Sequence, residues 1–270
     1  MINSQGLNNK LQNMLDLEHF NLALAFFAFC GGFVDATVGG GGLLIVPALM
    51  YAFPNQSLAT IFGTNKVVAI AGATSSALGF MRRVTISWKL ILPTMLSAFI
   101  FAYIGALSVS LIPKQLMQYA VFILLILMAI YTFAKKDLGQ VHTAVQFGPR
   151  EIALGVIFGG LIGFYDGVFG PGSGSFLLFL FIKVFAFDFI HAVASAKLVN
   201  IATFSAALFF FAPAGHVLWF TGVYMAVFGF IGAICGTILA FKLGSGFIRI
   251  FFLILLIFLI GRMGYDLFMN

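Results

Sequence analysis

The chain alternates between long apolar segments and short polar connections. Apolar runs lie at about 21–38, 42–53, 57–80, 90–112 and 116–133, and again at about 152–169, 174–187, 189–212, 219–241 and 247–268. Most of these runs approach the ~20 residues that a helix needs to cross a bilayer. In lipid only helices and closed barrels satisfy every backbone hydrogen bond, and barrel strands would alternate polar and apolar residues over about ten positions. The pattern therefore predicts an all-α polytopic integral membrane protein.

Composition points the same way. Of 270 residues 62% are hydrophobic and 8% are charged, whereas a typical soluble domain carries ~25% charged residues. The net charge of +6 could suggest a nucleic-acid partner, but no basic stripe with interleaved aromatic residues lies outside the apolar runs. We therefore expect lysine and arginine to be retained in cytoplasmic loops, and the partners to be the lipid bilayer and a small solute, with no nucleic acid.

The two groups of five segments form an internal repeat with an offset of 131 residues. The repeated pairs are Gly32–Gly163, Phe33–Phe164, Asp35–Asp166, Gly39–Gly170, Gly41–Gly172, Lys66–Lys197, Trp88–Trp219 and Gly105–Gly236. Ser57 corresponds to Asp188, and both residues suit the N-cap of a following helix. The second segment of each group is shorter than a full span, which predicts a half-helix or one arm of a re-entrant hairpin. The predicted organisation is a polar tail at 1–20, a first transmembrane repeat at 21–134, a cytoplasmic connecting loop at 135–151 and a second repeat at 152–270.

The basic loops predict the orientation of the segments. Arg82, Arg83 and Lys89 follow the third segment of the first group, whereas 213–218, the corresponding loop of the second group, has no lysine or arginine. The loop holding Lys242 is basic instead, so the positive bias switches loops between the groups. We favour two inverted repeats in which the first two segments form a hairpin. Parallel repeats, in which those segments make one broken crossing, are the alternative.

Four ionisable residues lie inside apolar runs, namely Asp35, Lys66, Asp166 and Lys197. Each costs about 2.5–3.5 kcal/mol near the centre of a membrane helix, so such residues are expected to be paired. In each half one acid precedes one base. The simplest structural explanation is that the acid and the base of each half neutralise one another and pin two helices together. Their position near the midplane, beside glycine clusters, favours a functional site.

The glycine clusters are 39–42, with four consecutive glycines, and 170–175, which reads GPGSGS. Such runs are poor helix formers and predict a break before each short helix. A break exposes backbone N–H groups, and the start of the next helix adds a positive dipole end, so the arrangement suits an anion. Asn65, Asn200 and Ser173 could donate further hydrogen bonds, although each asparagine equally suits an interhelical hydrogen bond. The predicted substrate-binding set is Asp35, Gly39, Gly40, Gly41, Gly42, Asn65, Lys66, Asp166, Gly170, Gly172, Ser173, Lys197 and Asn200.

The strings GGFVDATVGGGGLLIVPAL, GTNKVVA, GFYDGVFGPGSGSF and SAKLVN resemble the TauE/SafE family, whose members are described as sulfite exporters or sulfonate permeases. The resemblance covers about 26–264, and every residue of the predicted set except Ser173 falls on a matching motif position. It implies a secondary transporter of the bacterial inner membrane that moves sulfite, organosulfonates or related anions. The chain most resembles the uncharacterised branch, so the substrate itself does not carry over.

We therefore expect alternating access at a central anion site, with export favoured by an inside-negative potential and with proton coupling through Asp35 or Asp166 as a further possibility. An anion channel and a structural membrane protein without transport activity are the alternatives. The chain contains no HExxH or CxxC spacing and no GxSxG motif, so we expect no enzyme activity, cofactor or metal. Cys30 and Cys235 lie in apolar runs and are expected to be packing residues.

Overall fold

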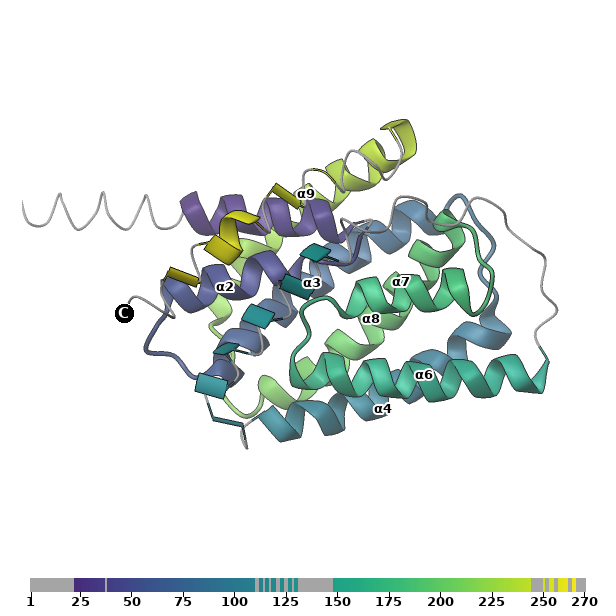
Figure 1. Cartoon of the computed structure of the whole chain (residues 1–270), viewed down its shortest axis with the longest axis horizontal. Helices are drawn as coiled ribbons and strands as arrows, with labels where there is room; N and C mark the ends of the chain where they lie inside the picture. The colour runs from purple at the N-terminus through teal and green to yellow at the C-terminus, as the bar shows by residue number, and fades with distance from the viewer. Residues whose placement is uncertain are drawn as a thin grey trace, which may run out of the picture.

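The computed structural model describes residues 22–36, 38–109 and 148–243, together with scattered positions between 112 and 130 and between 250 and 265. These residues form helices and no strand (Figure 1). The helices are Leu22–Asp35, α2 (Gly42–Ala52), α3 (Leu58–Met81), α4 (Trp88–Ser108), α6 (Pro149–Val168), α7 (Ser173–Lys183), α8 (Phe189–Phe211) and α9 (Trp219–Leu243). Four of them, α4, α6, α8 and α9, are long and apolar enough to cross a membrane. The prediction of an all-α membrane protein is confirmed.

Several sequence predictions lie outside the described residues. They are the polar tail at 1–20, most of the connecting loop at 135–151 and most of the segments at 116–133 and 247–268. The remaining predicted segments each correspond to one helix. The second segment of each group is short, as predicted, because α2 and α7 have 11 residues each.

Both predicted N-caps are present. Ser57 Oγ accepts a hydrogen bond from the Thr60 N–H at 3.2 Å at the start of α3. Asp188 Oδ1 accepts one from the His191 N–H at 2.9 Å at the start of α8. Each cap satisfies an amide that has no partner within the helix, and it fixes the point at which the chain enters a long helix.

Helices α3 and α9 lie side by side and run in the same direction. Near their starts Gly63 lies against the carbonyl of His216, and near their ends the rings of Phe80 and Phe241 are 4.9 Å apart. Helices α4 and α6 are also parallel, because Gly155 contacts Leu90 near both starts and Gly167 contacts Ala102 further along. The loop at 82–87 joins the end of α3 to the start of α4. The ends of α3 and α9 therefore share one end of the helical body with the starts of α4 and α6.

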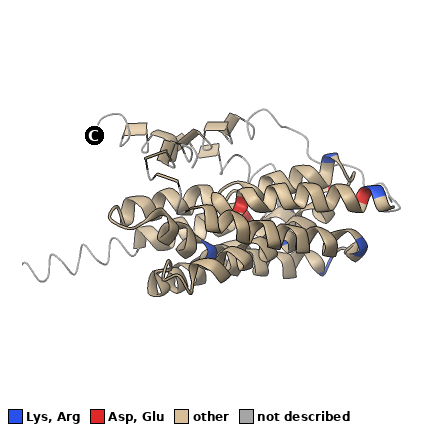
Figure 2. Ribbon diagram, turned by 90° about the horizontal axis from the view of Figure 1, so that it is seen from below, with Lys and Arg blue, Asp and Glu red and all other residues tan. Residues whose placement is uncertain are grey.

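This end carries the charged residues that flank the helices. Figure 2 shows charged positions gathered at one end of the helical body and a few others in its middle. The basic residues at the helix termini on this end are Arg82, Arg83, Lys89, Arg150, Lys183 and Lys242. We call it the basic end. It is held together in part by the Arg83 guanidinium, which lies 4.2 Å from the centre of the Phe241 ring.

Close backbone packing joins helices from the two halves of the chain. Along the α4–α6 contact, a Cβ atom on Gly163 would lie only 2.7 Å from the Ala98 Cα. On helix Leu22–Asp35, the carbonyl of Phe33 lies against Gly236 of α9 in the same manner. Small residues permit such approaches, which are a common basis of helix association in membranes.

The short helices complete two hairpins that enter from opposite ends. Helix Leu22–Asp35 turns back into α2, whose Ile45 faces Gly31, and α2 leads to the start of α3 at the end opposite the basic end. Helix α6 begins at the basic end and turns back into α7. Figure 1 shows α2 and α7 on either side of the centre. We call residues 36 and 38–41 the first hairpin tip, and residues 169–175, which include the first turn of α7, the second hairpin tip.

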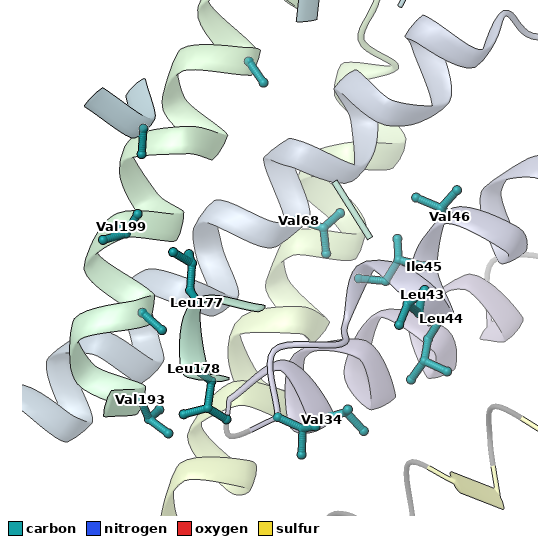
Figure 3. Packing of buried hydrophobic residues seen from close by; sticks show 14 of the residues in the cluster. Val34, Leu43, Leu44, Ile45, Val46, Val68, Leu177, Leu178, Val193 and Val199 are labelled. Carbon is teal, nitrogen blue, oxygen red and sulfur yellow. The ribbon is translucent and has the colours of Figure 1, made fainter. Parts of the chain in front are cut away.

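The short helices are largely buried, and α7 exposes Phe176 and Phe179 on one side. In α2 every residue from Leu43 to Leu49 is buried, and α7 buries most of its apolar residues. Figure 3 shows Leu43, Leu44, Ile45 and Val46 of α2, with Leu177 and Leu178 of α7, among the packed core residues. A helix that is apolar all round is stable only when protein or lipid surrounds it. The longer helices supply that cover and hold the hairpin tips in the middle of the molecule.

Candidate functional site

Two buried ion pairs lie at the hairpin tips. Lys66 Nζ donates to Asp166 Oδ1 at 3.0 Å and to the Asp166 carbonyl at 2.8 Å. Lys197 Nζ donates to Asp35 Oδ2 at 2.6 Å. The prediction that the acid and the base of the same half neutralise each other is therefore wrong. Each acid is paired with the base of the other half. Because the hairpins enter from opposite ends, each acid reaches the lysine of the other half.

The secondary structure explains these positions. Asp35 is the last residue of its helix, and Asp166 lies two residues before the end of α6, so both acids lie where a hairpin arm ends and its tip begins. Lys66 and Lys197 lie within the long helices α3 and α8, next to the tips. The Lys66 ammonium is also 4.7 Å from the centre of the Phe204 ring, which is a cation–π contact.

Both glycine clusters break the helix, as predicted. The backbone has positive φ angles at Gly39 (76°), Gly170 (83°) and Gly172 (85°), a conformation that other residues adopt only at a cost. The two tips also touch each other, since a Cβ atom on Gly39 would lie 2.7 Å from the Gly174 Cα. Ser175 Oγ donates to the carbonyl of Val38 at 2.5 Å and so links α7 to the first tip.

The tips hold the two carboxylates by further donors. Ser173 Oγ donates to Asp166 Oδ1 at 2.7 Å. The Gly41 N–H points at Asp35 Oδ1 across a longer distance of 3.4 Å. The first carboxylate is therefore held less tightly by its own hairpin than the second.

Several buried polar atoms beside the tips have no hydrogen-bond partner among the described residues. They are Asn65 Oδ1, both amide atoms of Asn200 and Asp166 Oδ2. Asn65 is 3% exposed and Asn200 is 0% exposed. The Asn65 amide lies beside Gly42 at the start of α2, and the Asn200 amide lies beside Gly174 in the first turn of α7. Most buried polar groups are paired, so these atoms mark a place where a ligand or water belongs.

A small cavity opens beside the first tip. Its volume is about 20 Å³, which is room for a water molecule. The predicted residues in its wall are Asp35, Gly39, Gly41, Gly42, Asn65, Gly170, Gly172 and Ser173. The predicted residues outside its wall are Gly40, Lys66, Asp166, Lys197 and Asn200, although the ion pairs connect both lysines to the hairpin tips.

The structure adds wall residues that the sequence analysis missed. They are Gly31, Gly32, Ile45, Val68, Ala69, Gly72 and Phe204. Gly32 belongs to a repeated motif and could have been found from it. Ala69, Gly72 and Phe204 carry no such signal, because small or apolar residues within a membrane helix are usually packing residues. Tyr165 was also missed, and its hydroxyl donates to the Pro171 carbonyl at 2.7 Å across the second hairpin.

The site contains groups of the kind that bind anions, together with two carboxylates that neutralise its ammonium groups. It combines ammonium groups, backbone N–H groups of the tips, side-chain amides and the start of a short helix. Among the described residues, no cluster of three or more His, Cys, Asp or Glu could hold a metal ion. Cys30 and Cys235 are free thiols.

Comparison with known proteins places the chain in a family. The family described as "Sulfite exporter TauE/SafE" matches residues 24–263. The chain is 36% identical to the probable membrane transporter protein ORF9 of Sinorhizobium sp, over 87% of this chain and 89% of that protein. It is 35% identical to the probable membrane transporter protein YfcA of Escherichia coli (strain K12), over 90% of this chain and 89% of the other. No solved structure matches the chain. With its multi-pass helical fold and a family match over most of its length, the chain belongs to the TauE/SafE family.

Proposed function

We propose that this protein is a secondary transporter that moves a small anion across the bacterial inner membrane by alternating access. The substrate class is sulfite, an organosulfonate, or a related sulfur-containing or carboxylate anion. The observation that carries the proposal is the meeting of two hairpin tips, where buried lysines are already paired with carboxylates and where Asn65 and Asn200 carry unpartnered amide atoms. The family match and the names of the relatives support a transporter.

The carboxylates act as internal substitutes for the substrate. In the empty site each lysine is neutralised by an aspartate, which avoids the cost of an unpaired charge in the membrane. An arriving anion offers the same lysine a second negatively charged partner besides the aspartate. The ammonium is then shared or exchanged between the carboxylate and the substrate. The bound anion adds one negative charge, which a proton on the aspartate would compensate.

The small cavity supports a closed conformation. A volume of about 20 Å³ holds a water molecule but no sulfonate. Binding therefore requires the hairpin tips to separate. Since the tips enter from opposite ends, a movement of one hairpin against the other opens the site toward one side of the membrane at a time, which is alternating access.

Inverted repeats are part of this proposal. Helix α3 runs toward the basic end, whereas α8, at the corresponding positions of the second half, starts there and ends beside Gly63 near the start of α3. Helix α4 starts at the basic end, whereas α9 finishes there. These opposite directions support inversion over the parallel arrangement, in which corresponding helices would share a direction.

The basic end faces the cytoplasm in this proposal, following the positive-inside rule. Export of an anion from an inside-negative cell gains about 2.3 kcal/mol per charge for each 100 mV. Export therefore needs no coupling ion. If a proton is carried as well, Asp35 or Asp166 is its carrier.

The test is transport by purified protein in proteoliposomes. Sulfite, methanesulfonate and acetate are first screened for binding by thermal shift. Saturable, voltage-driven flux of an anion that stabilises the protein supports the proposal. Non-saturating single-channel currents would establish the channel alternative, and the absence of both binding and flux for all three anions would contradict anion transport.

A further inference from the structure

The cavity is built mainly by one half of the chain. Its wall contains Ala69 and Gly72 of α3. The corresponding positions of α8, 131 residues later, hold Asn200 and Thr203, and both are 0% exposed. The second half thus carries larger side chains than the first at these two positions.

The two ion pairs also differ between the halves, in their exposure and in their distance from the cavity. Asp35 lies in the cavity wall, and its side chain is 12% exposed. Asp166 lies outside the wall with a side chain that is 0% exposed, and it accepts hydrogen bonds from Lys66 and from the Ser173 hydroxyl. Of the four charged residues in these two pairs, only Asp35 borders the cavity, and Lys197 lies behind it as its partner.

A buried polar group points to a ligand at this place. Asn65 lies in the cavity wall and is 3% exposed, and its Oδ1 atom has no partner among the described residues. This oxygen is an acceptor, which a water molecule or a protonated group of a ligand would serve. The Asn65 amide nitrogen lies beside Gly42, the first residue of α2. Together with the Gly41 N–H, which is held by Asp35 only at 3.4 Å, it offers donors that an oxyanion can use.

We propose that the protein has one substrate pocket, on the side of the first half, and that its two ion pairs have different roles. Asp35 and Lys197 form the exchangeable pair, in which a small oxyanion takes over Lys197 and the Gly41 N–H from the Asp35 carboxylate. Lys66 and Asp166 form a permanent pair that ties the second hairpin to α3. This inference rests on the proposed function and narrows its site.

The competing arrangement is a symmetrical exchange, in which the second half forms an equal pocket when the transporter turns over. Asn200 and Thr203 oppose it, because their side chains would stand where Ala69 and Gly72 leave space. A Cβ atom on Gly72 would have only ordinary contacts, 3.7 Å from the Gly229 carbonyl and 3.9 Å from the Ala233 Cβ. A cysteine therefore fits at position 72, and Thr203→Cys is a near-isosteric matched variant.

The experiment compares the reactivity of these two cysteines. Gly72→Cys and Thr203→Cys are each placed in a background with Cys30→Ala and Cys235→Ala, reconstituted, and treated with methyl methanethiosulfonate. We expect Gly72→Cys to be modified at least about ten-fold faster, because thiol reactivity follows access. Equal rates, faster modification of Thr203→Cys, or no modification of either protein would overturn the single pocket. Full modification of both variants in detergent-unfolded samples shows that each thiol is free.

A second arm separates this inference from the proposed function. Methanesulfonate is added before the reagent, and the expected result is slower modification of Gly72→Cys. If Gly72→Cys still reacts faster than Thr203→Cys but no anion from the binding screen slows its modification, the single pocket is supported and anion binding in that pocket is contradicted. If an anion is transported but the two variants react equally, transport stands and the single pocket fails.

Discussion

Lys197 and Asp35 are separated by 162 residues in the chain, and yet the Lys197 ammonium lies 2.6 Å from the Asp35 carboxylate. The contact joins α8 to the tip of the first hairpin. Lys66 and Asp166 make the reciprocal contact between α3 and the second hairpin. Each half of the protein is therefore neutralised by the other, and a substrate that disturbs one pair also disturbs the contact between halves.

Replacing Lys197 with alanine removes the ammonium that is paired with Asp35 in the cavity wall. We expect Lys197→Ala to insert and fold but to lose anion flux to the background level. No ammonium group then remains that could leave the Asp35 carboxylate and bind the substrate. Counterflow of a bound anion in proteoliposomes measures this. Lys242→Ala, at the end of α9, is the matched control and should keep wild-type flux; wild-type flux in Lys197→Ala would remove this lysine from the site.

Replacing Lys66 tests the permanent pair. Lys66→Ala leaves the Asp166 carboxylate buried with the Ser173 hydroxyl as its remaining side-chain donor. Removing one partner of a buried ion pair costs about 3–5 kcal/mol, so we expect a clearly lower unfolding temperature along with loss of flux. Lys197→Ala should destabilise the protein less, since water in the cavity can reach Asp35. Equal unfolding temperatures for the two variants would contradict the different roles.

Gly39 combines a left-handed backbone with a close contact between the tips. In Gly39→Ala the positive φ alone costs about 1–2 kcal/mol, and the new methyl group would overlap Gly174 and Ser175, adding ~1–3 kcal/mol. Gly215→Ala is a matched control, because Gly215 has φ 75° and open space at its Cβ position. Denaturation in detergent should show the larger loss for Gly39→Ala. Similar losses would mean that the tips do not touch.

The hydroxyl of Ser175 links the hairpins. Ser175→Ala removes its hydrogen bond to the Val38 carbonyl, and we expect a loss of about 1 kcal/mol in the free energy of unfolding. Because the bond holds the tips together, the rate of anion exchange should also change. Ser108→Ala removes only an exposed bond to Ile104 within α4 and should leave both quantities unchanged; the same behaviour of Ser175→Ala would exclude a role for this link in closing the site.

The inverted arrangement predicts which side of the membrane two loops face. Arg83 and Ala214 lie 131 residues apart at corresponding positions, and both are exposed. In the background without native cysteines, Arg83→Cys should react with an impermeant thiol reagent only from the cytoplasmic side and Ala214→Cys only from the opposite side. Labelling of both from one side would establish parallel repeats.

The sequence alone predicted much of the helical framework. Continuous apolar runs near 20 residues can satisfy their backbone in lipid only as helices, and Ser57 and Asp188 mark helix starts by local hydrogen bonds. Local chemistry also predicted the breaks, because Gly39 and Gly170 adopt angles that favour glycine. The charged residues were identified as exceptional from the cost of burying them in a membrane helix.

The partners of those residues were decided by the tertiary structure. Within each half the acid and the base are equally spaced, and nothing local indicates whether Asp35 meets Lys66 or Lys197. The choice follows from how the two hairpins enter from opposite ends and pass beside α3 and α8. The same packing decides that the cavity wall contains Gly72 and not Thr203, although both residues are buried. A cavity depends on side chains brought together from several helices and not on the order of residues in one.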